Sequence, residues 1–257
     1  MARSQVKQAL LDRIDADAEK HIALLQSLIR APTPNPPGDT KEAVEVVKAY
    51  LTAHNIESTI IAPKSESPNL LSVFNSPEPS DEGCSKPPSI VLNGHIDQFP
   101  VEDASKWKLD PFSRDVEDGY ILGRSCVDMK AGTAASIIAF TYLHQICDQL
   151  KGKCVLQVVS DEETGGRWGT RYLLEHMADR DKDKYQGDCI LIGEPITAQA
   201  AHGAYTHRSE GAIRIACRLI TALLSLEKLD LPMDEKIKKH MQQSAFRRVA
   251  DSIMWPG

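Results

Sequence analysis

Apolar residues in the first part of the chain recur at the spacing of a helix. Between residues 5 and 30 they fall three or four positions apart, at Ile22, Leu24, Leu25, Leu28 and Ile29. This spacing predicts a helix that buries one side. The run APTPNPPGD contains several helix breakers, so the helix is expected to end before Pro32. A second helix is predicted over 41–54 by the same periodicity.

The next apolar segments are shorter and are typical of strands. Short strands are predicted at 58–62 and 69–74, and the Pro- and Ser-rich stretch 75–88 is predicted to be an exposed loop. Three later runs are nearly continuous in Val, Ile and Leu, namely 89–93, 154–159 and 189–192. Continuous apolar runs favour strands that are covered on both faces by helices.

Helical patterns follow the three runs and complete the prediction of the fold. They lie at about 130–150, 168–178 and 209–228, with a final amphipathic stretch at 234–254. Alternation of strands and helices predicts an α/β domain in which a mixed, largely parallel sheet is flanked by helices.

Composition and charge narrow the class of protein. Of the 257 residues, 42% are hydrophobic and 26% are charged, as in ordinary soluble globular proteins. The net charge of −6 and the lack of a dense Lys/Arg tract argue against a nucleic-acid or membrane partner. We find no signal peptide and no apolar run of membrane-spanning length. The six cysteines form no C-x-x-C pair, which favours reduced thiols and a cytoplasmic location.

Each of the three apolar runs ends in residues that bind metals. The first is followed by His95 and Asp97, the second by Glu162 and Glu163, and the third by Glu194. Open α/β sheets bind ligands beyond the carboxyl ends of their strands. We therefore expect these side chains to meet at one edge of the sheet.

Each of these residues also has an ordinary structural interpretation. His95 could be a core histidine beside a solvated Asp97, although alternate residues of a strand share a face and Asp97 is spaced to orient a metal-bound imidazole. Asp128 could be a helix N-cap, or a carboxylate that bridges two cations. Glu162 and Glu163 could form a solvated acidic turn, or divide metal binding and proton transfer between them. Glu194 could be an exposed strand terminus.

Together, one histidine and several carboxylates suit Zn²⁺, with Mn²⁺ or Co²⁺ as alternatives. Two cations that share a bridging carboxylate would acidify a water and polarise a scissile carbonyl. A free glutamate would then carry the proton to the leaving amine.

Five motifs give the chain a family resemblance over about residues 15–225. They are GHIDQFP, WKLDPF, DGYILGRSCVDMKAG, SDEETGG and IGEP, in that order. In this combination the chain resembles the zinc-dependent deacylases and exopeptidases, a family that includes acetylornithine deacetylase, succinyl-diaminopimelate desuccinylase, aminoacylase and glutamate carboxypeptidases. The resemblance implies cleavage of an amide bond in an N-acyl amino acid or peptide, two zinc ions and a homodimer.

The resemblance also implies a role for each matching residue. His95 and Glu194 would bind one zinc and Glu163 the other, Asp128 would bridge both, and Asp97 would orient His95. Glu162 would be the general base and later the acid. His202 resembles a lid-domain histidine that stabilises the oxyanion across the dimer interface, although a loop histidine without that role is an equal alternative.

The chain departs from the family pattern in several places. Phe99 replaces the usual valine and Ser125 the usual glycine, and both changes look tolerable. His202 follows Glu194 by only 8 positions, where the family has a hinge and a lid strand. No counterpart of the family's last zinc histidine is found, since His240 lies in a charged helical stretch and fits a surface residue better.

We therefore expect a catalytic domain at 1–197 and an incomplete remnant of the α+β lid or dimerisation domain at 198–257, as in a truncated form. The main alternative function is a catalytically impaired isoform or relic that binds metal and pairs with a full-length partner. A phosphatase-like two-metal enzyme fits the motif order less well.

Overall fold

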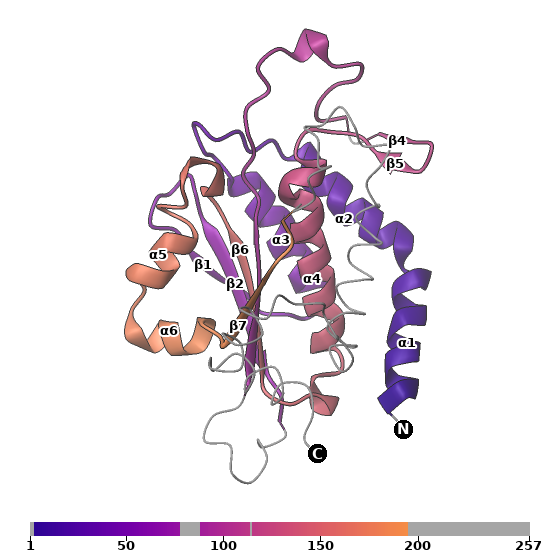
Figure 1. Ribbon diagram of the computed structural model, residues 1–257, viewed down its shortest axis with the longest axis vertical. Coiled ribbons are helices and arrows are strands. Elements are labelled where there is room, and N and C mark those ends of the chain that lie inside the picture. The colour runs from indigo at the N-terminus through magenta and orange to yellow at the C-terminus, as the bar shows by residue number, and fades with distance from the viewer. Residues whose placement is uncertain (1–2, 78–87, 114, 195–257) are drawn as a thin grey trace, which may run out of the picture.

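A five-stranded mixed sheet forms the centre of the molecule (Figure 1). This computed structural model describes residues 3–77, 88–113 and 115–194. In spatial order the strands are β1 (Thr59–Ile61), β2 (Asn69–Asn75), β6 (Lys153–Val159), β3 (Ser89–His95) and β7 (Cys189–Ile192). β3 runs parallel to both β6 and β7, whereas β2 is antiparallel to β6 and to β1. The predicted α/β fold with a mixed sheet is confirmed.

The larger part of the core lies on one face of the sheet. The helices α2 (Ala18–Arg30), α3 (Lys41–Ala53) and α4 (Ala131–His144) pack there, together with α1 (Arg3–Ala16). Leu28, Leu51 and Phe140 are fully buried in the same core cluster as Leu92 of the sheet. Residues 131–143 of α4 are all buried, which agrees with their being almost all apolar or small.

A smaller core covers the other face. It is built from the short helices α5 (Thr170–Glu175) and α6 (Asp179–Tyr185), which lie across the sheet from α4 in Figure 1. Leu173 and Tyr185 pack against Val91 and Val155, and the Tyr185 hydroxyl donates to Thr59 Oγ1 at 2.8 Å. Helices on both faces explain why β3 and β6 are continuous apolar runs. The expectation of full burial is wrong for β7, where Ile190 and Ile192 are exposed.

Three helix predictions need correction. The helix expected over 5–30 is two helices that meet at Asp17, whose carboxylate accepts hydrogen bonds from Lys20 and Tyr142 instead of capping α2. The helix expected over 130–150 ends at His144 and is followed by the short 3₁₀ helix η3 (Cys147–Gln149). The stretch 168–178 contains only α5, because a turn occupies the residues up to Gly169.

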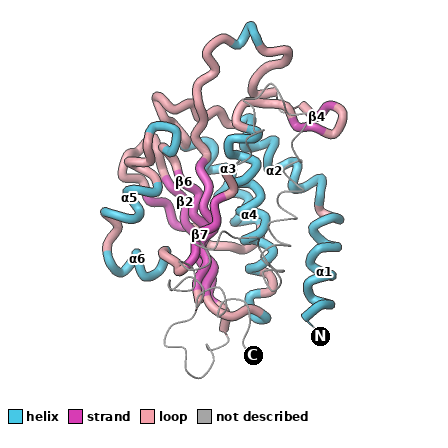
Figure 2. Tube along the Cα trace, viewed as in Figure 1, coloured by secondary structure: helices cyan, strands magenta, loops and turns pink. Residues whose placement is uncertain are grey.

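The connections at the carboxyl ends of the parallel strands hold the remaining elements. They include the 3₁₀ helices η1 (Ala104–Lys106) and η4 (Glu162–Thr164), the small hairpin of β4 (Val116–Glu117) and β5 (Tyr120–Ile121), and the irregular turn η2 (Cys126–Lys130). Figure 2 shows these loops gathered at one end of the sheet. The hairpin was not predicted.

Two general expectations can be compared with the described residues. Cys126, Cys147, Cys154 and Cys189 are free thiols, as predicted, whereas Cys84 and Cys217 lie outside the described residues. Within the described ranges, none of the helices is both long enough and apolar enough to cross a membrane.

Candidate metal centre

The ends of three neighbouring parallel strands bring the candidate site together. His95 is the last residue of β3, Asp161 lies just beyond the end of β6, and Glu194 lies just beyond the end of β7. Because β3 lies between β6 and β7 in parallel register, the three strand ends meet at one edge of the sheet. This is the placement expected from the sequence.

His95 is the centre of the arrangement. Its side chain is 1% exposed, and its Nδ1 lies 3.0 Å from the backbone oxygen of Asp97 and 3.3 Å from Asp97 Oδ1. Its Nε2 is buried and has no hydrogen-bond partner among the described residues. Three carboxylate oxygens face this nitrogen: Glu194 Oε1 at 3.2 Å, Asp128 Oδ1 at 3.4 Å and Glu162 Oε2 at 3.7 Å.

The electrostatics of the site favour a positive charge at this point. Burial by itself would favour the neutral imidazole, but Asp128, Asp97 and Glu194 outweigh it and raise the pKa of His95 to about 12. The ligand atoms of His95, Asp128 and Glu194 all lie within 4.8 Å of one another. A cation placed among them would give the unpartnered Nε2 a ligand bond and would neutralise the carboxylates, so the donor set fits a metal ion.

Asp128 reaches the site from the irregular turn η2. Its backbone is extended (φ −115°, ψ 105°), and the N-cap of α4 is Lys130. The alternative that Asp128 caps this helix is therefore wrong. Lys130 is fully buried, and its Nζ donates to Leu28 O, Ala31 O and Gln98 Oε1 at 2.8–3.0 Å.

Asp97 lies behind His95 and connects it to the neighbouring strand end. It is fully buried, and its carboxylate accepts from the backbone N–H groups of Glu162 (3.1 Å) and Glu163 (3.0 Å) and from Asn35 Nδ2 (2.8 Å). Burial raises the pKa of Asp97, but His95 and Asn35 outweigh it and hold the pKa below its usual value. Asp97 is therefore an ionised acceptor that contacts both the imidazole and the turn after β6.

Glu162 and Glu163 point in different directions. Glu162 is exposed and faces His95, whereas Glu163 Oε1 accepts from the backbone N–H of Phe99 at 3.0 Å. Burial raises the pKa of both glutamates, and neighbouring carboxylates raise it further. Among the described residues, Glu163 is not one of the three donors that gather around a single point.

Sequence reasoning missed three buried polar residues around the site, namely Asn35, Gln98 and Lys130. Asn35 lies in the APTPNPPGD run, which we interpreted as a helix terminator and as a segment that fits the family, without a role for Asn35 itself. Lys130 was noted as part of a motif without a role. Nothing local in the sequence shows that these side chains point inward, because their partners lie far away along the chain.

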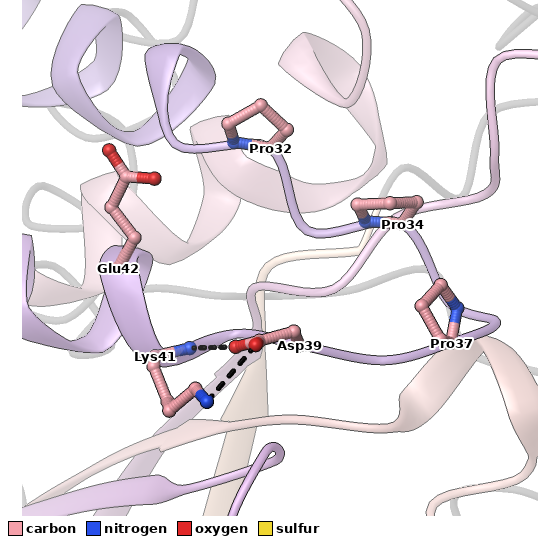
Figure 3. A pocket seen from close by; sticks show the side chains of 6 residues that line it. All are labelled: Pro32, Pro34, Pro37, Asp39, Lys41 and Glu42. Atoms are coloured by element: carbon pink, nitrogen blue, oxygen red, sulfur yellow. Dashed lines mark hydrogen bonds and ion pairs between the residues drawn. The ribbon is translucent and has the colours of Figure 1, made fainter.

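Other parts of the prediction lie outside the described residues or away from the site. His202 and the whole segment 198–257 are not described, so the expected second domain stays a prediction. A pocket of about 270 Å³ lies beside the loop before α3 and is lined by Pro32, Pro34, Pro37, Asp39, Lys41 and Glu42 (Figure 3). None of the predicted site residues that the structure describes lines it. The pocket is bordered by the Asp39–Lys41 ion pair at 3.2 Å.

Comparison with known proteins places the chain in a family. Residues 91–245, more than half of the chain, match "Peptidase family M20/M25/M40". The chain is 34% identical to N-formyl-4-amino-5-aminomethyl-2-methylpyrimidine deformylase of Halalkalibacterium halodurans, over 89% of this chain and 57% of that protein. It is 37% identical to succinyl-diaminopimelate desuccinylase of a Bradyrhizobium species, over 56% of this chain and 42% of that protein. The chain thus spans about half the length of the curated relatives it matches.

Solved structures support the same fold. Human carnosine dipeptidase 1 superimposes with a TM-score of 0.59 at 18% identity, over 74% of this chain and 42% of that chain. The M20 family metallo-carboxypeptidase Sso-CP2 of Sulfolobus solfataricus gives a TM-score of 0.54 at 19% identity, over 67% and 37%. With the family match and the resemblance expected from the five motifs, these findings establish that the chain belongs to peptidase family M20/M25/M40.

Proposed function

We propose that this chain carries a metal-dependent hydrolase site that cleaves amide bonds. The observation that carries the proposal is the buried His95 Nε2, which has no hydrogen-bond partner among the described residues and faces three carboxylates. His95, Asp128 and Glu194 would hold one cation, and Asp97 would fix the imidazole from behind, as a carboxylate behind a metal-bound histidine does. Asp128 and Glu163 would supply ligands to a second cation.

Zinc is the cation we favour, because one imidazole with carboxylates is a donor set that zinc binds, with Co²⁺ or Mn²⁺ as substitutes. When bound, zinc supplies a Lewis acid that polarises the scissile carbonyl and lowers the pKa of a water. The free thiols of the described residues are consistent with a reducing, cytoplasmic location.

Glu162 is the residue we propose for proton transfer. It lies close to His95 Nε2 but is exposed, so a water or an amine can reach its carboxylate. Burial raises its pKa, and although the positive His95 opposes this effect, Glu194, Asp97 and Asp128 reinforce it. A carboxylate with a raised pKa can accept a proton from water and then donate it to the leaving amine.

The names of the relatives support a proposal for the substrate class. One curated relative is named a deformylase and another a desuccinylase, and both names describe removal of an acyl group. A solved relative is named a dipeptidase. We infer that the substrate of this site is a small N-acylated amine or amino acid, or a short peptide.

Glu162→Gln tests the assignment. The amide keeps the size of the side chain but cannot accept a proton, so we expect hydrolysis to fall by at least about 100-fold while zinc binding is retained. The assay uses N-formyl, N-succinyl and N-acetyl amino acids and dipeptides, together with zinc analysis of each purified protein. Glu175→Gln is the matched control, since Glu175 is exposed at the end of α5 and its ion-pair partners among the described residues are the nearby Arg171 and His176.

Three outcomes are distinguishable. Full activity of the Glu162→Gln protein would reject the role of Glu162. Absence of zinc binding in the unaltered chain would reject the metal centre. Zinc binding without turnover of any substrate would favour the alternative of a metal-binding protein that is catalytically impaired.

A further inference from the structure

Asn35 is buried in the loop between α2 and α3, at the back of the site. Asn35 is only 4% exposed to solvent. Backbone contacts hold the loop on the segment after β3: Asn35 N–H donates to Gln98 O at 2.8 Å, and Gln98 N–H donates to Thr33 O at 3.0 Å. These backbone hydrogen bonds hold the loop in place, so the side chain of Asn35 is not needed to anchor it.

The side-chain amide of Asn35 contacts two different strand ends. Its Nδ2 lies 2.8 Å from Asp97 Oδ2, 3.2 Å from Asp161 Oδ1 and 3.0 Å from Thr164 Oγ1. Asp97 follows β3 and contacts His95, whereas Asp161 and Thr164 flank Glu162 in the turn after β6. One NH₂ group thus joins the segment that orients the histidine to the turn that carries the glutamates.

The charges around Asn35 explain why a hydrogen-bond donor is needed there. Asp97 is fully buried and Asp161 is 6% exposed, and like charges this close to one another are costly unless hydrogen-bond donors satisfy them. Asp161 also accepts from Thr164 Oγ1 at 2.5 Å and from the Trp168 backbone N–H at 3.0 Å. Among the described residues, the Asn35 amide is a side-chain donor that the two carboxylates share.

We propose that Asn35 is a positioning residue of the metal centre. By donating to Asp97 and to the Asp161–Thr164 turn, it fixes the orientation of His95 and the distance from His95 to Glu162. This inference rests on the proposed function, because it assigns Asn35 a part in the same site. Residues that support metal ligands in this way change metal affinity by roughly 10–100-fold when replaced.

The test compares Asn35→Asp and Asn35→Ala with the same changes at Asn93. Asn35→Asp keeps the shape but replaces the two donor hydrogens with a third carboxylate, and Asn35→Ala removes the amide. Asn93 is a suitable control because it is equally buried and its Nδ2 donates to Gln157 in the middle of the sheet. Co²⁺ is titrated into each metal-free protein and followed by its visible absorption, and thermal unfolding is measured without metal.

We expect Asn35→Asp to bind Co²⁺ at least tenfold more weakly and with an altered absorption spectrum, and Asn35→Ala to be weakened in the same direction. The Asn93 variants should unfold at lower temperature but keep their Co²⁺ affinity. Unchanged Co²⁺ affinity in folded Asn35 variants would overturn the proposal. So would both Asn35 variants being unfolded without metal while the Asn93 variants fold, because Asn35 would then be part of the framework. If the unaltered chain binds no Co²⁺, the proposed function fails together with this inference.

Discussion

Lys130 shows how one buried side chain connects the metal centre to the core. Burial lowers its pKa to about 7, which reflects the cost of removing an ammonium group from water. Three oxygens from α2, from the residue after α2 and from Gln98 offset that cost by accepting hydrogen bonds. Lys130 therefore attaches the turn that carries Asp128 to the end of α2.

Lys130→Met should destabilise the fold. The methionine fills a similar volume but leaves two carbonyls and one amide oxygen without their donor, so we expect the free energy of unfolding to fall by about 2–4 kcal/mol. Urea unfolding measures the change. Lys48→Met is the control, since Lys48 is exposed on α3 and pairs with Glu45 at 3.7 Å, and we expect it to stay within about 0.5 kcal/mol. Equal stability of the two variants would contradict the anchoring role.

At the scale of elements, the start of α4 and the end of β7 touch through two glycines. A Cβ added to Gly132 would lie 2.2 Å from the backbone oxygen of Gly193, the residue before Glu194. The same close approach is seen from Gly193, whose added Cβ would lie 3.0 Å from Gly132 Cα. The packing of α4 against the end of β7 thus determines how closely Glu194 approaches His95.

Gly132→Ala tests this contact, because the close approach and the helix propensity of alanine have opposite effects on stability. Propensity alone would stabilise α4 by up to about 1 kcal/mol, but the clash forces the strand end away. We therefore expect a net loss of about 1–3 kcal/mol in stability and weaker zinc binding. Thermal unfolding and zinc titration measure the two effects.

The control is Ser136→Ala in the same helix. It removes a buried hydroxyl that has no hydrogen-bond partner among the described residues, so the stability of the fold should stay unchanged or rise slightly. A stabilised Gly132→Ala protein would show that the contact is unimportant.

At the scale of the whole molecule, one edge of the sheet collects the candidate ligands. β3 contributes His95, β7 contributes Glu194 and the turn before α4 contributes Asp128, so one group of three donors is complete among the described residues. Glu163 instead accepts a hydrogen bond from Phe99. The described part of the chain therefore offers one full set of ligands and part of a second.

The number of bound metals tests this difference. After chelation, reloading with zinc and removal of excess metal, we expect elemental analysis to find nearer one zinc per chain than two. Added calcium should not displace the zinc, because Ca²⁺ prefers oxygen ligands and the imidazole of His95 binds it poorly. Two tightly held zinc ions per chain would show that residues beyond those described complete the second set.

The sequence by itself determined the strands of the central sheet and the kinds of side chain at their ends. Short apolar runs located the five strands of the central sheet to within about two residues, whereas the β4–β5 hairpin was missed. His95, Asp97 and Glu194 were recognisable because they follow apolar runs. These signals are local, since the spacing of apolar side chains reflects which face of a helix or strand is buried.

Only the tertiary structure decided which of these residues meet and what holds them there. Asn35 and Asp97 are 62 positions apart and Lys130 and Leu28 are 102 apart, so no local pattern connects them. The order of the strands brings β3 between β6 and β7, and this neighbourhood leaves His95 Nε2 facing carboxylates from separate segments. The break at Asp17 and the inward-pointing amide of Asn35 likewise depend on partners that the chain supplies only when it is folded.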